Sequence, residues 1–133
     1  MKPNSKHLGG LSRIKEKEIL DDKISYPIFC FKYLHKSYHI NSCENEDKIR
    51  FLERIISLSG MTWQEIEYSP KHGMGTEKIQ RSSIKQDLPN EITDDVTHFL
   101  AFRFSGKKPF VGFRERFIFH ILYIDRDFTL YKH

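Results

Sequence analysis

Apolar side chains alternate with other residues in several short stretches of the chain, which is the pattern of β-strands. In 26–34, aromatic residues recur at every second position, and this enrichment predicts a strand. A turn and a short second strand at 38–41 would complete a hairpin with it. Near the C-terminus, strand character returns in 97–104, 110–125 and 128–132, with turn residues between these segments. Because "FIFHILYI" is apolar on both faces, we expect it to be the central strand.

The middle of the chain has the spacing of helices instead. In 45–60, apolar residues recur at i, i+3, i+4 and i+7, which predicts a helix that Asn45 caps and Gly60 ends. A second helix begins at the capping box Thr62 to Glu65, and its apolar residues would face the core. The residues expected on the buried faces of the two helices are Ile49, Leu52, Ile55, Ile56, Trp63 and Ile66.

The resulting order is β-β-α-α, a long polar loop at 69–91, and then β-β-β. This order predicts an α+β fold, in which two helices pack on an antiparallel β-sheet. Residues 1–12 have little to bury and are expected to form a disordered tail, so that 13–133 would be a single domain.

Composition narrows the function classes only modestly. The net charge of +4 favours anionic partners such as nucleic acid. The two cysteines, Cys30 and Cys43, have no zinc-ligand spacing, and we expect neither a metal nor another cofactor. There is no signal-peptide pattern and no stretch of about 18 apolar residues, so we predict a cytoplasmic protein with no membrane contact.

Basic residues gather around the turn between two predicted C-terminal strands. Guanidinium and ammonium groups on one sheet face suit phosphate oxygens, so this hairpin is a candidate phosphate-binding surface. Alternation places Arg114 and Arg116 on one face, and the turn could bring Arg103 close to them. The alternative is that the hairpin is charged for solubility and edge protection. The candidate residues are Arg103, Lys107, Lys108, Arg114 and Arg116.

The loop "SPKHGMGTEKI" raises a second candidate. Lys71 can neutralise a phosphate, and His72 can exchange a proton near neutral pH. Gly73 and Gly75 would let the backbone approach a ligand. The loop matches no P-loop or dinucleotide motif, and it could equally be a plain connection with an inert surface histidine.

Two further residues could act on a ligand. His120 lies on an otherwise apolar strand, where a histidine is either a buried neutral residue or a candidate general acid or base. Tyr131 lies on the polar face of the last predicted strand and could stack on a base, or simply end an amphipathic edge strand.

The segment "FRFSGKKPFVGFRERFIFHILYIDRDFTLYKH" resembles the C-terminal end of RelE/ParE-type toxins. The resemblance implies a small toxin-like endoribonuclease that cleaves RNA by acid–base catalysis without a metal. It implies RNA or the ribosome as target and an antitoxin-like protein as partner. It also implies that Arg103, Arg114 and Arg116 hold phosphate, that His120 is the base candidate on the sheet, and that Tyr131 or His133 is the C-terminal candidate.

An alternative from another class uses the same residues without catalysis. In that case the chain is a binding module that holds nucleic acid or a protein through the basic hairpin 103–116. An enzyme would need a His, Tyr or Glu side chain within about 3 Å of the position where the basic groups hold a phosphate.

Overall fold

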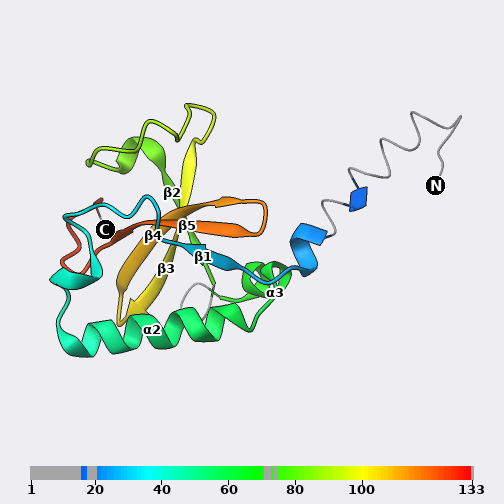
Figure 1. Cartoon of the computed structure of the whole chain (residues 1–133), viewed down its shortest axis with the longest axis horizontal. Helices are drawn as coiled ribbons and strands as arrows, with labels where there is room; N and C mark the ends of the chain where they lie inside the picture. The colour runs from blue at the N-terminus through cyan, green and yellow to red at the C-terminus, as the bar shows by residue number, and fades with distance from the viewer. Residues whose placement is uncertain (1–15, 18–20, 71–72, 74, 133) are drawn as a thin grey trace, which may run out of the picture.

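The computed structural model describes residues 16–17, 21–70, 73 and 75–132, so the tail expected at 1–12 lies outside the described residues. The described chain is α+β, and its centre is a five-stranded sheet (Figure 1). No helix within the described ranges is long and apolar enough to cross a membrane. The strands are β1 (Ile28–Cys30), β2 (Glu77–Gln80), β3 (His98–Ser105), β4 (Lys108–Glu115) and β5 (Ile118–Ile124).

The sheet is mixed, so the expectation of a purely antiparallel sheet is wrong. The strand order is β1-β5-β4-β3-β2. The pairs from β2 to β5 are antiparallel, whereas β1 runs parallel to β5. The middle strand is therefore β4, and the stretch that we expected at the centre, β5, is its neighbour.

The hairpin predicted at 26–41 does not form. This segment instead lies along the edge of β5 that does not pair with β4. Beyond β1, the N–H of His35 donates to Leu122 O (2.8 Å), and the N–H of Ile124 donates to Tyr38 O (2.8 Å). The segment thus follows β5 along its length without turning back, and it ends in a 3₁₀ turn at Ile40–Ser42.

Two other predicted elements also differ. The long loop contains β2, which pairs with β3 and forms one edge of the sheet. The last predicted strand, 128–132, is irregular instead, because the Asp125 carboxylate accepts hydrogen bonds from the N–H groups of Thr129 and Leu130 (both 3.1 Å). These bonds turn the chain back, and the side chain of Leu130 becomes fully buried.

Helix α2 (Asn45–Ser59) and helix α3 (Trp63–Tyr68) lie between β1 and β2 in the chain. The capping box at α3 is confirmed, and Trp63 and Ile66 are buried as expected. The predicted buried face of α2 is wrong at Ile49, Leu52 and Ile56, which are about 60% exposed, whereas the predicted Ile55 is partly buried against the core. Phe51 and Leu58 are buried instead, because the large ring of Phe51 packs against other phenylalanines of the core and sets the rotation of the helix.

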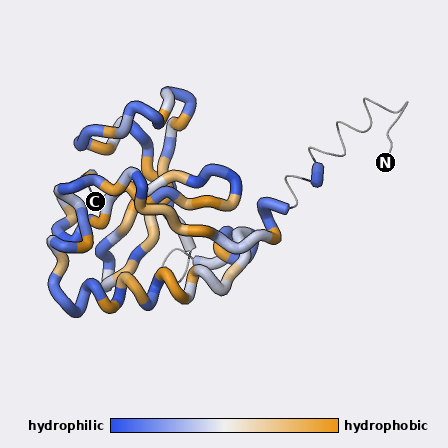
Figure 2. Tube along the Cα trace, in the orientation of Figure 1, coloured by the Kyte–Doolittle hydropathy of each residue, from blue (hydrophilic) through white to orange (hydrophobic). Residues whose placement is uncertain are grey.

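Each face of the sheet carries its own hydrophobic cluster. The first cluster lies between the sheet and α2 and α3, and it contains most of the buried phenylalanines. The second lies on the opposite face, under the segments 84–96 and 128–132 and the residues Tyr33 and Tyr38. Figure 2 shows hydrophobic positions along the central strands and hydrophilic positions along the outer loops. The sheet is thus covered by helices on one face and by loops on the other.

One partly buried ion pair joins α2 to the first residue of β4. Lys108 Nζ lies 2.7 Å from Asp47 Oδ2, and Asp47 is only 6% exposed. The hydrogen bond from Lys108 lowers the pKa of Asp47 below its ordinary value, and the same bond raises the pKa of Lys108. The pair therefore stabilises the folded state wherever both groups are charged.

We predict that Lys108→Ala lowers the free energy of unfolding by about 1–3 kcal/mol at neutral pH, because it leaves the Asp47 carboxylate buried without its cation. The contribution of a carboxyl with a lowered pKa is present above its unfolded pKa and is lost as the pH falls through the folded one. The difference between the two proteins should therefore shrink below about pH 4. Urea unfolding at several pH values measures it.

The matched control is Lys107→Ala, at the exposed neighbouring position. This variant should change the free energy of unfolding by less than about 0.5 kcal/mol. Equal effects of the two variants would show that the ion pair does not stabilise the fold.

Candidate functional site

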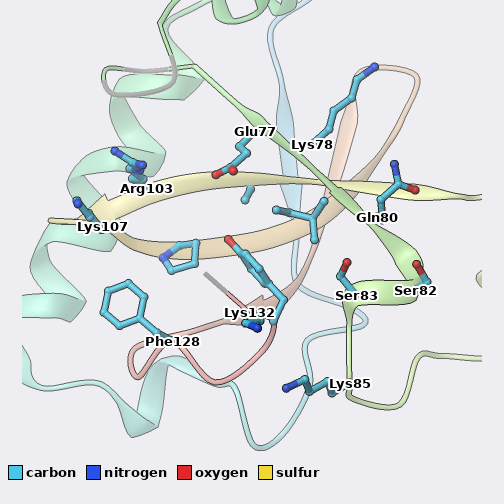
Figure 3. A pocket seen from close by; sticks show the side chains of 14 residues that line it. Glu77, Lys78, Gln80, Ser82, Ser83, Lys85, Arg103, Lys107, Phe128 and Lys132 are labelled. Carbon is cyan, nitrogen blue, oxygen red and sulfur yellow. The ribbon is translucent and has the colours of Figure 1, made fainter.

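A cavity of about 690 Å³ opens on the loop-covered face of the sheet, beside its β2 edge (Figure 3). Its volume is in the range of ligand-binding pockets. Three parts of the chain far apart in sequence meet there: β2 with the turn after it, the β3–β4 hairpin, and the C-terminal segment. The lining residues are Glu77, Lys78, Ile79, Gln80, Ser82, Ser83, Lys85, Ala101, Arg103, Lys107, Pro109, Phe128, Tyr131 and Lys132.

The lining of this cavity, which we call the basic pocket, is strongly cationic. Among its described lining residues, Glu77 is the one acid, and the cations are Lys78, Lys85, Arg103, Lys107 and Lys132. Several cations around a concave surface concentrate positive potential in it and attract anions. The composition of the pocket therefore favours a ligand with phosphate groups.

Strand alternation explains why Arg103 faces this pocket. In β3, Phe102 and Phe104 point into the core under the helices, so Arg103 between them points to the opposite face. In the register of β2 against β3, Glu77 lies opposite Ala101, which is on the same face as Arg103. Figure 3 shows Glu77 and Arg103 extending into the same space, with Lys107 next to Arg103. A carboxylate and a guanidinium are thus held on neighbouring strands.

Tyr131 closes the pocket from the C-terminal segment. It is 7% exposed, and the turn that Asp125 stabilises holds it against the sheet. Burial first of all, and then the negative charges of Glu77 and Asp125, raise the pKa of Tyr131 to about 12, against the opposing charge of Arg103. The phenol therefore remains protonated at neutral pH and is available as a proton donor.

Three of the candidate residues predicted from sequence meet in the basic pocket: Arg103, Lys107 and Tyr131. Lys108 follows Lys107 in the chain, but its side chain pairs with Asp47. Lys71 and His72 lie outside the described residues, and so does His133.

The arginines expected beside Arg103 are not there, because they lie on the helix side of the sheet. The guanidinium of Arg114 stacks over Trp63 at 4.2 Å and pairs with Glu67 at 3.0 Å. Arg116 lies in the β4–β5 turn at φ 57° and pairs with Asp22 at 3.1 Å. The predicted grouping of Arg103 with these two residues is therefore wrong.

His120 is a packed residue and does not line the basic pocket. It is 8% exposed and lies between the rings of Phe113 (4.7 Å) and Tyr33 (5.5 Å). Its Nε2 contacts Glu115 Oε1 at 3.0 Å, whereas its buried Nδ1 has no hydrogen-bond partner. This environment resembles that of a core histidine more than that of a base open to a ligand.

The glycine-rich loop has a structural explanation in its described part. The N–H groups of Gly73 and Gly75 both donate to Pro70 O, and Arg54 donates to Gly73 O. A Cβ on Gly75 would lie 2.2 Å from Ser69 O, so the tight turn itself requires glycine at this position.

Sequence patterns missed four charged lining residues of the basic pocket. Glu77 and Lys78 were hidden because β2 is short and mostly polar, with a single buried residue at Ile79. Lys85 and Lys132 lie in irregular segments, where no periodicity places a side chain. The only available signal was the alternation around Ile79, which is too short to distinguish a strand from a loop.

Within the described part of the chain, no group of three or more His, Cys, Asp or Glu residues is arranged to hold a metal ion. Comparison with protein-family models, with curated proteins and with solved structures gave no match. The resemblance of the C-terminal segment to RelE/ParE-type toxins therefore stays a prediction.

The packing of His120 leads to a prediction that distinguishes a structural role of this residue from a role as a base. His120→Phe keeps a ring between Phe113 and Tyr33 and removes the unpartnered buried nitrogen, so the free energy of unfolding should stay within about 1.5 kcal/mol of the original. His120→Ala should lower it by about 3 kcal/mol, because it opens a cavity. Urea unfolding measures both.

The His120→Phe variant also tests whether His120 acts as a base. We expect His120→Phe to keep any activity on RNA, because the residue lies outside the basic pocket. A folded Phe variant without that activity would show that the imidazole takes part in the chemistry.

Proposed function

We propose that the protein is a small, toxin-like, metal-independent endoribonuclease whose active site is the basic pocket. The observation that carries the proposal is that Glu77, Arg103 and Tyr131 surround one cavity. Among the residues that the structure describes there, the other charged ones are all lysines. A carboxylate, a guanidinium and a protonated phenol are together sufficient for acid–base cleavage of an RNA phosphodiester.

In this mechanism the 2′-hydroxyl of RNA is the nucleophile. The Glu77 carboxylate takes the 2′-hydroxyl proton while the 2′-oxygen attacks the neighbouring phosphorus. Arg103 donates hydrogen bonds to the phosphate oxygens, where negative charge grows in the transition state. Tyr131 gives its proton to the departing 5′-oxygen. The bond between phosphorus and that oxygen breaks, which leaves a 2′,3′-cyclic phosphate on one product and a 5′-hydroxyl on the other.

The environment of Tyr131 suits the role of an acid. Because its pKa is raised to about 12, the phenol is fully protonated throughout the physiological range. Transfer of its proton to a developing alkoxide is favourable, and Arg103 offsets the phenolate charge that results. Glu77, rather than His120, has the position of the base, because it lines the pocket and His120 does not.

The lysines around this centre would bind the RNA strand through its phosphates. Lys107 belongs to the β3–β4 turn and Lys132 to the C-terminal segment, whereas Lys78 and Lys85 belong to β2 and the segment that follows it. Binding of this kind releases counterions and weakens steeply as salt increases. Messenger RNA, alone or on the ribosome, is the proposed substrate in the cytoplasm, and an antitoxin-like protein is the proposed partner, as in the toxins that residues 102–133 resemble.

We expect the purified protein to cut a single-stranded RNA in the presence of EDTA, and three substitutions to suppress the cut. Glu77→Gln and Tyr131→Phe should each slow it about 10²–10⁴-fold, because each removes one proton transfer. Arg103→Ala should slow it about 10²–10³-fold through the lost charge stabilisation. A denaturing gel of end-labelled RNA over time measures the rates.

Matched controls are available on the helices. Glu53→Gln repeats the carboxylate-to-amide change on the exposed surface of α2. Tyr68→Phe removes the phenol hydroxyl of a residue that is 79% exposed. Both should cleave like the original protein. Salt-dependent RNA binding without any cleavage would contradict catalysis and favour the alternative, a non-enzymatic binding module at the same pocket.

A further inference from the structure

A second cavity, of about 600 Å³, lies next to the basic pocket at the edge of the sheet. Lys78 lines both cavities, so they meet at β2. The basic pocket contacts Ile79 and Tyr131 of the loop-side core, whereas the second cavity contacts Trp63 and Ile66 of the helix-side core. The second cavity also contacts Val96 and Phe113, which pack against the loop-side core, so it reaches both faces of the sheet at the β2 edge. A strand that runs along this edge can enter both cavities.

The walls of the second cavity combine an apolar floor with polar groups at the rim. The floor contains the buried side chains of Trp63 and Ile66 and the half-buried side chains of Leu100 and Phe113. The rim has the exposed residues Thr97, His98 and Asp95, and the carboxylate of Glu67. An apolar floor that includes the aromatic rings of Trp63 and Phe113, with a polar rim, fits a planar ligand whose edge carries hydrogen-bonding groups, as a nucleobase does.

The two carboxylates of the second cavity are both fixed by neighbours. Glu67 Oε2 accepts a hydrogen bond from Arg114 (3.0 Å), which in turn stacks on Trp63. Asp95 Oδ1 accepts one from the Thr93 hydroxyl, and this bond lowers the pKa of Asp95. Asp95 therefore remains ionised, and an ionised carboxylate can only accept hydrogen bonds.

We propose that the second cavity binds the base of the nucleotide next to the cleaved phosphodiester and selects guanine, while Lys78 holds the phosphate between the two cavities. Guanine is the base whose pairing edge presents two adjacent N–H donors, at N1 and N2, and one carboxylate accepts both. We assign this contact to Asp95, because Glu67 is paired with the guanidinium cation of Arg114, whereas the partner of Asp95 is the neutral hydroxyl of Thr93. This subsite rests on the proposed function, since it needs an RNA strand in the basic pocket.

Trp63 provides a readout that does not depend on cleavage. It is the single tryptophan of the chain, and it lines the second cavity but not the basic pocket. A base that enters the second cavity should therefore change the fluorescence of the protein. Occupancy of the basic pocket alone should leave the emission of Trp63 nearly unchanged.

The experiment uses 2′-O-methyl pentanucleotides, which lack the attacking hydroxyl. One carries a central guanine between uridines, and the others carry adenine, cytosine or uracil at that position. Anisotropy of labelled oligonucleotides gives their affinities, and unlabelled ones are titrated against Trp63 emission. We expect the guanine oligonucleotide to bind about tenfold more tightly than the all-uridine one and to change the emission most.

Substitutions then separate the two cavities. Asp95→Asn should abolish the preference for guanine, so that the guanine and the all-uridine oligonucleotides bind with similar affinity. Asp94→Asn is the matched control, because the neighbouring Asp94 is exposed and does not line the cavity. Arg103→Ala should weaken binding of all four oligonucleotides by a similar factor, since it acts in the basic pocket.

Three outcomes would overturn the subsite. If the oligonucleotides bind through Arg103 but show no guanine preference and no change in Trp63 emission, the basic pocket stands and the subsite is wrong. If the guanine preference survives Asp95→Asn, the assignment to Asp95 is wrong. If none of the oligonucleotides binds, the proposed function itself fails and the subsite fails with it.

Discussion

The ring of Phe110, on the middle strand of the sheet, is the contact on which the other elements converge. Its side chain is fully buried, and burial of such a ring stabilises a fold by about 1.5–3 kcal/mol. The rings around it come from β1, α2, β3 and β5, so one side chain fixes the positions of four elements. The ring centroids around that of Phe110 are those of Phe51 and Phe102 (5.2 Å each), Phe119 (6.3 Å), Phe104 (6.4 Å) and Phe29 (6.5 Å).

This aromatic cluster also explains which parts of the fold were predictable from sequence. The alternation around Phe102 and the capping box at Thr62 are local signals, and the structure confirms both elements. The rotation of α2 is set by Phe51 meeting rings from distant strands, and a count of apolar spacings along the helix cannot include that contact. The parallel pairing of β1 with β5 and the edge strand β2 likewise depend on partners far away in the chain.

The candidate site was predictable from sequence only where strand alternation decides which face of the sheet a side chain lies on. Phe102 and Phe104 point into the helix-side core and force Arg103 to the other face, which the spacing alone implies. Nothing local shows that Glu77 pairs across from Ala101, so the carboxylate of the proposed mechanism was missed. Arg103 and Arg114 are both arginines of the same hairpin, and the sequence gives no reason to separate them. In the structure Arg103 lines the basic pocket, whereas Arg114 contacts Trp63 and Glu67 on the other face of the sheet.

The central claim is that Glu77, Arg103 and Tyr131 direct the 2′-hydroxyl of RNA against its own phosphodiester. The most direct test is mass spectrometry of the ends of RNA fragments produced by the protein in EDTA. The mechanism predicts 2′,3′-cyclic phosphate and 5′-hydroxyl ends, which Glu77→Gln should abolish. Fragments with 3′-hydroxyl and 5′-phosphate ends would show that water attacks instead, and RNA that stays intact would contradict catalysis at this pocket altogether.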